Sequence, residues 1–536
     1  MCVVGPRERL SGFIRDHPVE LSLVLILGVY FAIRLINIRA VPMHIDEAIY
    51  IKWARDAQHG NLWASLLWDG KPPLHSWMMV PFLAAIKDPL LAGRLNSVFF
   101  GGVTTVGIFL IGKELKDWKL GAIAAGLYAV CPFGFFFDRL ALAESMMLAL
   151  FVFAVYFAVK AATSANHLYL IGAGIATGLA LLTKGTATLL LPIIFFAYLA
   201  RGPAGKGREK SRPLVRWTAA VGLSMLLGFA ILNLLRLSPR WADRSTYIAT
   251  RTKGIVAALH TPLKDILRFN SSILQSMFHD LTPIVLAVAI AGLALTLAKK
   301  WRPGLFLWAW VLIGVAVISL VGEFTWWRFY LVLVPPLLLS AAYGFYVPGT
   351  FLVRAWNRKR AEGRLVLGAA SLTALALVLA VTVVPLGTQL HGMSTAKIGE
   401  AEYLTGRCAG VGMKQTADLV ARLSASQKIN VVVNDYFVQL AIEIYNGNSP
   451  NVHLTCLELE YRKGYTELLK KTSESEAVTG PTYLIVNDSK SLPKSWPLRV
   501  LEEFKKNDRR TRSSMLVMKV ERSGTRFTAM SPAGVI

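Results

Sequence analysis

The sequence predicts an α-helical polytopic membrane protein of about 11 transmembrane helices, within a range of about 9–13, carrying a small C-terminal α/β domain. Long apolar runs recur along the chain, and 54% of its 536 residues are hydrophobic. The mean hydropathy is +0.48. A bilayer core requires about 20 apolar residues per helix, and a helix satisfies its own backbone polar groups in lipid. These runs therefore indicate membrane-spanning helices.

The charge of the chain has a matching pattern. Its 58 Lys and Arg residues outnumber its 33 Asp and Glu residues, which gives a net charge of +25. In a soluble protein such an excess would suggest a nucleic-acid partner. Here the cations gather in short loops between apolar runs, so they indicate cytoplasmic loops beside anionic membrane lipid. Membrane lipid is thus an expected partner, and nucleic acid is not.

Eleven apolar runs have the length and composition of membrane spans. A further run, 74–86, is short and contains Pro81, so it predicts a re-entrant or surface helix. The eleven expected spans are 21–38, 95–111, 120–137, 146–159, 168–182, 186–199, 217–235, 281–298, 305–321, 329–346 and 365–385.

The loop charges also predict the orientation in the cell membrane. Short loops rich in Lys and Arg remain inside, so the N-terminus is expected in the cytoplasm and the C-terminal domain outside it. The loop 236–280 would then be a basic outer loop. Either the span count is wrong there or its cations bind an anionic ligand, and we favour the ligand. This orientation brings six candidate residues to the outer face: Asp46, Lys71, Arg139, Glu144, Lys184 and Arg328.

Two domains are expected. Residues 1–388 form the transmembrane domain, with outer loops at 39–93 and 236–280, and residues 389–536 form an extracytoplasmic α/β domain. In the second domain, β-branched segments closed by Asn-Asp predict strands at 428–435 and 482–488. Helices are expected at 417–423 and 465–471, and a disulfide between Cys408 and Cys456 is possible if the domain lies outside the cytoplasm.

The stretch after the first span carries two adjacent carboxylates, Asp46 and Glu47. Ile45, Ile49 and Trp53 recur every four residues behind them, and Gly60 ends the pattern, which predicts a short amphipathic helix on the membrane surface. Both carboxylates would lie at the positive N-terminal end of this helix. The simplest interpretation is that Asp46 only caps the helix.

Further motifs follow in a fixed order: K-P-P-L from Lys71, D-R-L-A-L-A-E-S from Asp138, G-L-A-L-L-T-K-G from Gly178, and W-R-F-Y-L-V-L-V-P-P from Trp327. With the Asp46-Glu47 pair, they resemble the GT-C glycosyltransferases, in particular the protein O-mannosyltransferases and the lipid A aminoarabinose transferases. The resemblance spans roughly residues 20–345. It implies a glycosyltransferase that takes a sugar from a polyprenyl-phosphate donor and gives it to a protein, lipid or glycan outside the cytoplasm.

Such a transfer needs few catalytic groups. The leaving phosphate is already ionised and needs only cations, whereas the acceptor hydroxyl needs a carboxylate to take its proton. By resemblance, Asp46 is the expected general base and Glu47 the second choice, although a Glu in a first turn is favoured by the helix dipole alone. The resemblance makes Glu144 the second carboxylate of the site, where it could orient the acceptor or a metal. Its alternative role is a salt bridge to Arg139.

For the donor phosphate, Lys71 and Arg328 are the first candidates, then Arg139, with Arg94 and Lys184 as weaker ones. Each could instead extend to lipid headgroups. The candidates for contacts to the sugar or acceptor are His75, Tyr330 and Trp327. A lone His is more often structural, and the two aromatic residues could simply anchor the membrane interface.

A metal and two other functions remain open. In the aminoarabinose transferases the residue before the Lys-Pro-Pro lysine is usually acidic and has been linked to a metal. Here it is Gly70, so a divalent ion is in doubt and no metal ligand is assigned. A transporter of lipid-linked sugar would show matching repeats, which this sequence lacks. An oligosaccharyltransferase would carry a W-W-D-type motif in a soluble domain, but Trp326-Trp327 precede Arg328 between two spans.

Overall fold

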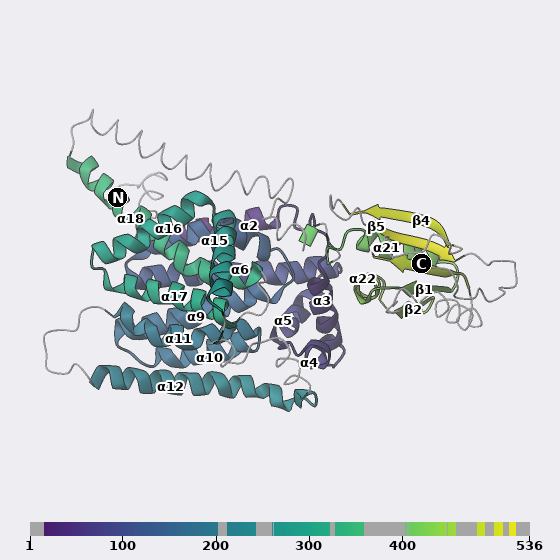
Figure 1. Ribbon diagram of the computed structural model, residues 1–536, viewed down its shortest axis with the longest axis horizontal. Helices are drawn as coiled ribbons and strands as arrows, with labels where there is room; N and C mark the ends of the chain where they lie inside the picture. The colour runs from purple at the N-terminus through teal and green to yellow at the C-terminus, as the bar shows by residue number, and fades with distance from the viewer. Residues whose placement is uncertain are drawn as a thin grey trace, which may run out of the picture. The chain divides into compact units, whose positions relative to one another are not determined.

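The computed structural model divides the chain into two compact units (Figure 1). One comprises residues 1–40 and 53–398, and the other comprises 41–52 and 399–536. The expected domain boundary near residue 389 lies outside the described residues. The structure describes residues 16–201, 212–242, 260, 262–321, 327–358, 403–404, 406, 408–447, 449–456, 480–487, 498–506 and 514–520.

The first unit is a bundle of apolar helices. Six described helices are long and apolar enough to cross a membrane, and five shorter apolar helices accompany them. Each of the ten expected spans that lie in the described part of the chain coincides with one apolar helix or with two or three consecutive helical elements. The helices are α2 (Pro18–Leu35), α6 (Pro89–Leu115), α7 (Trp118–Val130), α8 (Pro132–Phe137), α9 (Ala143–Ser164), α10 (Tyr169–Leu181), α11 (Leu190–Phe196), α12 (Arg212–Leu232), α16 (Pro283–Ala298), α17 (Arg302–Val321) and α18 (Val334–Arg358).

Shorter elements connect or extend these helices. The expected surface helix at 74–86 is present as α5, with bounds that differ by one residue. The eleventh expected span, 365–385, lies outside the described residues. The connecting elements are α3 (Ile45–Gln58), α4 (Ala64–Asp69), α5 (Leu74–Ala85), α15 (Leu263–Asp280) and four 3₁₀ turns, η1 (Gly185–Leu189), η2 (Ala197–Ala200), η3 (Asn233–Leu237) and η4 (Trp327–Leu333).

Two details differ from the sequence-based expectation. The span 120–137 is two helices, because Pro132 offers no backbone N–H and the preceding Cys131 is extended, with φ −64° and ψ 123°. The segment 236–280, expected as a loop, contains the 18-residue helix α15. Its apolar residues Ile266, Phe269, Ile273 and Met277 recur three or four apart, which suits one face of a helix and forms no continuous run.

Close helix packing in the bundle depends on small residues. The clearest case joins α16 to α18, which pack against each other. A Cβ added at Gly292 would lie 1.9 Å from the backbone oxygen of Ser340 and 3.1 Å from the nitrogen of Gly344. The two backbones therefore touch, and no larger residue fits at this position.

The second unit contains a five-stranded sheet with the strand order β2-β1-β3-β5-β4. The strands β1 and β3, which were expected, are central, parallel and fully buried, as their apolar sequences require. The helix at 417–423 is present within α21, whereas the expected helix at 465–471 lies outside the described residues. The elements are α21 (Met413–Leu423), β1 (Ile429–Val433), α22 (Tyr436–Asn446), β2 (Val452–Cys456), β3 (Thr482–Val486), β4 (Leu498–Lys505) and β5 (Ser514–Val520).

Strand β5 makes the sheet mixed, since it runs antiparallel to both β3 and β4. Val432, Leu484 and Met518 bury their side chains together and join β1, β3 and β5 in one core. No disulfide joins Cys408 and Cys456 in the structure, so the possible disulfide of this unit is not formed.

Candidate active site

The first turn of α3 is held by His44 and Glu47. The backbone N–H of His44 donates to Glu47 Oε2 at 2.9 Å, and the backbone N–H of Asp46 donates to His44 Nδ1 at 3.1 Å. This reciprocal arrangement is a capping box in which a His replaces the usual Ser or Thr. Glu47 and His44 are both buried, with 0% and 2% exposure. Glu47 therefore has a structural task at this helix end.

Asp46 does not cap the helix, contrary to the simplest interpretation of the sequence. Helix α3 begins at Ile45, so Asp46 is already its second residue, and the capping hydrogen bonds use the side chains of His44 and Glu47. The Asp46 side chain is partly exposed. It remains at the positive end of the helix dipole, which favours its ionised form. Asp46 and Glu47 belong to the second unit.

In the first unit, three charged side chains from distant parts of the sequence meet. The Glu144 carboxylate accepts a hydrogen bond from Lys184 Nζ, and Arg328 Nε lies 3.3 Å from the same Oε1 atom. The exposed fractions of these side chains are 1% for Glu144, 18% for Lys184 and 13% for Arg328. We call these three residues the Glu144 cluster. The expected alternative, a pair between Glu144 and Arg139, is not the contact that forms.

The three residues of the Glu144 cluster each lie at the end of a helix. Glu144 lies in the first turn of α9, Lys184 follows the end of α10, and Arg328 lies in η4 immediately before α18. The Lys-Pro-Pro segment is joined to the same place, because the Leu74 N–H donates to the carbonyl oxygen of Leu182 at 3.1 Å. Lys71 acts electrostatically on Lys184 and packs over the Trp53 ring at 5.7 Å.

His75 lies beside the Glu144 cluster and contributes no charge to it. Burial lowers the pKa of His75 to about 4, which outweighs the opposing effect of the Glu144 carboxylate. The imidazole is thus neutral near pH 7. Burial also lowers the pKa of Lys184, and Glu144 opposes that shift by favouring the charged amine. Arg328 and Lys71 also lower the pKa of Lys184, so three cations lie close enough to repel one another at this site.

Arg139 and Arg94 have partners of a different kind. Arg139 Nη2 donates to the carbonyl oxygens of Ile36 and Asn37 at 2.9 and 2.5 Å, and Arg94 Nη1 donates to that of Ile38 at 2.7 Å. These carbonyls follow the end of α2, where a helix leaves acceptors unsatisfied. Both arginines are buried, and they fix this turn.

The sequence-based reasoning missed a buried ion pair between Arg34 and Asp138. Arg34 Nε lies 3.0 Å from Asp138 Oδ2, and both side chains have 0% exposure. The hydroxyls of Tyr30 and Tyr128 donate to the same carboxylate at 3.0 and 3.2 Å. The sequence does contain a signal for this pair, because Arg34 lies inside an apolar run and Asp138 directly follows one. A charged residue in such a position needs a partner.

The remaining expected residues are placed as follows. Tyr330 lies in η4 and is only 1% exposed, so its side chain is inside the bundle and does not anchor the lipid interface. Trp327 begins η4, and its side chain lies outside the described part. Among the described residues, no group of three His, Cys, Asp or Glu side chains could hold a metal ion.

Comparison with protein families gives one match. Residues 70–232 match the family described as Dolichyl-phosphate-mannose-protein mannosyltransferase. The matched segment contains Lys71, Glu144 and Lys184. A comparison with curated proteins finds no significant match.

Solved structures with a similar fold cover most of the chain. ArnT from Cupriavidus metallidurans in the apo state has a TM-score of 0.58 and 13% identity, covering 94% of this chain and 98% of that one. The same protein bound to undecaprenyl phosphate has a TM-score of 0.56 and 14% identity, with coverages of 93% and 97%. The archaeal oligosaccharyltransferase AglB from Archaeoglobus fulgidus, in complex with an inhibitory peptide and a dolichol-phosphate, has a TM-score of 0.52 and 14% identity, with coverages of 89% and 70%.

These matches confirm the resemblance that the sequence motifs indicate, including the fold class and the integral multi-pass membrane character. The predicted enzyme class, a membrane glycosyltransferase, is that of the matching family. The chain therefore has a fold similar to that of ArnT, and its residues 70–232 match the family described as Dolichyl-phosphate-mannose-protein mannosyltransferase.

Proposed function

We propose that this chain is a glycosyltransferase that moves a sugar from a polyprenyl-phosphate carrier to an acceptor outside the cytoplasm. The observation that carries the proposal is the Glu144 cluster together with Lys71. It is a largely buried site inside a GT-C fold where Lys184, Arg328 and Lys71 lie close together. Cations gathered at a buried position are costly in a membrane protein, and an anionic ligand offsets that cost.

A sugar phosphate on a lipid carrier has the required charge. Its phosphate is the leaving group, and cations near it stabilise the charge that develops as the glycosidic bond breaks. Arg328 offers a planar guanidinium that can donate two hydrogen bonds to phosphate oxygens, while Lys71 and Lys184 act as point charges. Two similar structures, ArnT with undecaprenyl phosphate and AglB with a dolichol-phosphate, support a lipid phosphate as the ligand.

In this proposal Glu144 is a positioning residue. Its carboxylate contacts both Lys184 and Arg328, so it holds two cations in place. Arg139 and Arg94 act indirectly, by fixing the turn after α2. Contacts of His75, Tyr330 and Trp327 to the sugar or acceptor remain part of the proposal.

Asp46 is the proposed general base. It is half-buried at the positive end of α3, where the side chains of His44 and Glu47 make the cap hydrogen bonds. A carboxylate that the helix dipole keeps ionised suits proton removal from an acceptor hydroxyl. The proposed acceptor is a protein, lipid or glycan that presents a hydroxyl outside the cytoplasm.

The test is consumption of defined donors by the purified protein in detergent. Polyprenyl phosphates carrying different radiolabelled sugars are supplied with an envelope extract as the acceptor source. We expect release of polyprenyl phosphate from at least one donor, coupled to label in the extract. Arg328→Gln should raise the donor KM roughly tenfold or more, since it removes a charge-assisted contact. Arg216→Gln, which changes an exposed arginine on α12, should match the wild type.

Failure would take either of two forms. If no donor is consumed although the donor binds, the transferase proposal is wrong. In that case, movement of intact donor across liposomes containing the protein would identify a transporter. If Arg328→Gln and Arg216→Gln consume donor equally well, the Glu144 cluster is not the donor site.

A further inference from the structure

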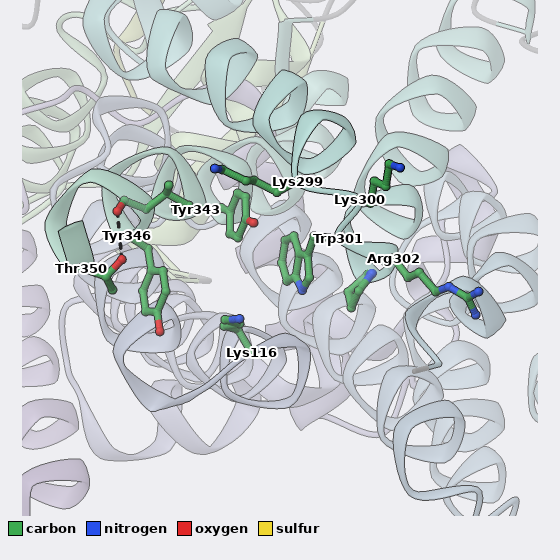
Figure 2. A pocket seen from close by; sticks show the side chains of 10 residues that line it. Lys116, Lys299, Lys300, Trp301, Arg302, Tyr343, Tyr346 and Thr350 are labelled. Carbon is green, nitrogen blue, oxygen red and sulfur yellow. Dashed lines mark hydrogen bonds between the residues drawn. The ribbon is translucent and has the colours of Figure 1, made fainter. Parts of the chain in front are cut away.

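A second cationic site lies at the other end of the helical bundle (Figure 2). It is a cavity of about 630 Å³. Four cations and three aromatic residues dominate its lining, and no Asp or Glu belongs to it. The residues that line it are Lys116, Lys299, Lys300, Trp301, Arg302, Pro303, Tyr343, Tyr346, Val347 and Thr350.

Helix connectivity shows that this cavity is remote from the Glu144 cluster. Lys116 follows the end of α6, and Glu114 at that end pairs with Lys160 near the end of α9, at 2.6 Å. Glu144 is at the opposite end of α9. The 16 residues from Glu144 to Lys160 correspond to about 24 Å of helix, close to the thickness of a bilayer core. The two cationic sites therefore belong to opposite membrane surfaces.

The carboxylates nearest to this cavity in the sequence form no salt bridge with its four cations, although Asp117 borders the cavity through the lining residue Tyr346. Asp117 caps α7 through the backbone N–H groups of Lys119 and Leu120, and its second oxygen accepts a hydrogen bond from Tyr346 at 2.5 Å. Glu114 is held by Lys160. Within the described part of the chain, none of the four cations lining the cavity forms a salt bridge. Their mutual repulsion thus favours an anionic occupant.

In the turn between α16 and α17, Lys300 adopts a backbone conformation that glycine adopts more easily than any other residue. The N–H of Trp301 donates to Thr296 O at 2.8 Å, and the N–H of Lys300 donates to Leu297 O at 2.9 Å. This is a Schellman motif, in which Lys300 occupies the left-handed position with φ +49°. Glycine is the residue that adopts this conformation without strain. A lysine at this strained position therefore suggests that its positive charge contributes to ligand binding.

The surroundings indicate a lipid. The turn separates two apolar helices, and Leu297 and Leu305 on either side of it are 51% and 43% exposed, as lipid-facing residues are. Trp301 stacks on Tyr343, with ring centroids 4.2 Å apart, which provides the aromatic surface typical of the membrane interface. In Figure 2 these two rings lie between Lys299 above and Lys116 below, with Lys300 and Arg302 to their right.

We propose that this cavity binds the phosphate-bearing headgroup of an anionic phospholipid from the leaflet opposite to the sugar-transfer site. Lys299, Lys300 and Arg302 would contact phosphate oxygens, while Lys116 closes the far side and the Trp301–Tyr343 pair supports the glycerol region. The acyl chains would lie along the apolar faces beside Leu297 and Leu305. This inference does not depend on the proposed transferase activity.

The experiment measures bound lipid by native mass spectrometry. Protein purified in a neutral detergent is mixed with equal amounts of phosphatidylglycerol and phosphatidylcholine. We expect retention of phosphatidylglycerol by the wild type, and roughly a tenfold or greater loss when Lys299, Lys300 and Arg302 are all changed to Gln. Lys113→Gln, which removes an exposed lysine of α6 outside the cavity, should retain as much lipid as the wild type.

A second variant separates binding from folding. Lys300→Gly removes the charge but relieves the strained backbone, so its thermal stability in lipid-free detergent should equal or exceed that of the wild type while its lipid retention falls. Equal retention by Lys300→Gly, the triple variant and Lys113→Gln would overturn the proposal. Displacement of the lipid by an equal concentration of inorganic phosphate, or retention of undecaprenyl phosphate in its place, would also overturn it.

Discussion

At the scale of single residues, the buried charge of Glu144 should contribute strongly to the stability of the protein. Its carboxylate is buried against two cations, and removal of one member of a buried pair leaves the others unmatched. Glu144→Gln should therefore destabilise the protein by about 3–5 kcal/mol. In the double variant Glu144→Gln/Lys184→Met one of the unmatched cations is also removed, so the protein should regain part of the lost stability. Thermal unfolding of both variants in one detergent checks this, and a double variant less stable than the single one would contradict it.

Lys184 gives the donor site a pH dependence. Burial lowers its pKa from the ordinary 10.5, so as the pH rises the amine loses its proton earlier than an exposed lysine does. The site then loses one of its positive charges, and the donor KM should rise at alkaline pH. In Lys184→Arg the charge persists, because arginine keeps its proton, so the rise in KM should move to higher pH. Identical alkaline limbs in the two proteins would exclude Lys184 from donor binding.

At the scale of helices, the packing of α16 on α18 makes a sharp prediction. Gly292→Ala should destabilise the protein by about 1–3 kcal/mol, because the new methyl group would meet backbone atoms that cannot rotate away. Gly222→Ala in α12 is the matched control, since nothing lies within 4 Å of its added Cβ. Alanine should there be neutral or stabilising by up to about 1 kcal/mol. Thermal unfolding of the two variants compares them, and equal effects would refute the close contact.

The sequence predicted the helices that have long apolar runs and missed features that depend on a partner. Continuous apolar runs located the expected spans to within a few residues at most ends. Helix α15 was missed because its apolar residues form one stripe and no run. The Arg34–Asp138 pair was missed because the two residues are 104 positions apart, and only the fold brings them together.

The sequence predicted which residues form the candidate site, but it did not predict which of them contact one another. The motifs supplied Glu144, Lys184 and Arg328, but the ion pair considered as an alternative for Glu144 was with Arg139, which lies in the same motif. The structure instead uses Arg139 to satisfy carbonyls after α2, a need that cannot be seen before the helix ends are placed. In the same way, Asp46 looked like a cap because the sequence does not reveal that the His44 ring accepts the hydrogen bond.

For the whole molecule, the two cationic sites predict the orientation in the membrane. Loops near the lipid-binding cavity are rich in Lys and Arg, so we expect them in the cytoplasm and the sheet-containing unit outside. Cysteine reporters at two exposed positions, Lys113 and Lys428, check this in a variant with Cys2, Cys408 and Cys456 changed to Ser. A membrane-impermeant maleimide should label intact cells at position 428 and should not label them at position 113. Labelling at both positions, or at 113 alone, would contradict the proposed orientation.

The most direct test of the proposed mechanism is the transfer rate of Asp46→Asn. The two side chains have nearly the same size, and the α3 cap uses His44 and Glu47, so thermal stability and donor KM should remain those of the wild type. Transfer of labelled sugar from the polyprenyl-phosphate donor should fall by about 10²–10⁴-fold, the usual effect of losing a general base. Near-normal transfer by a stable Asp46→Asn protein would contradict the account, because no base would then remain at this position.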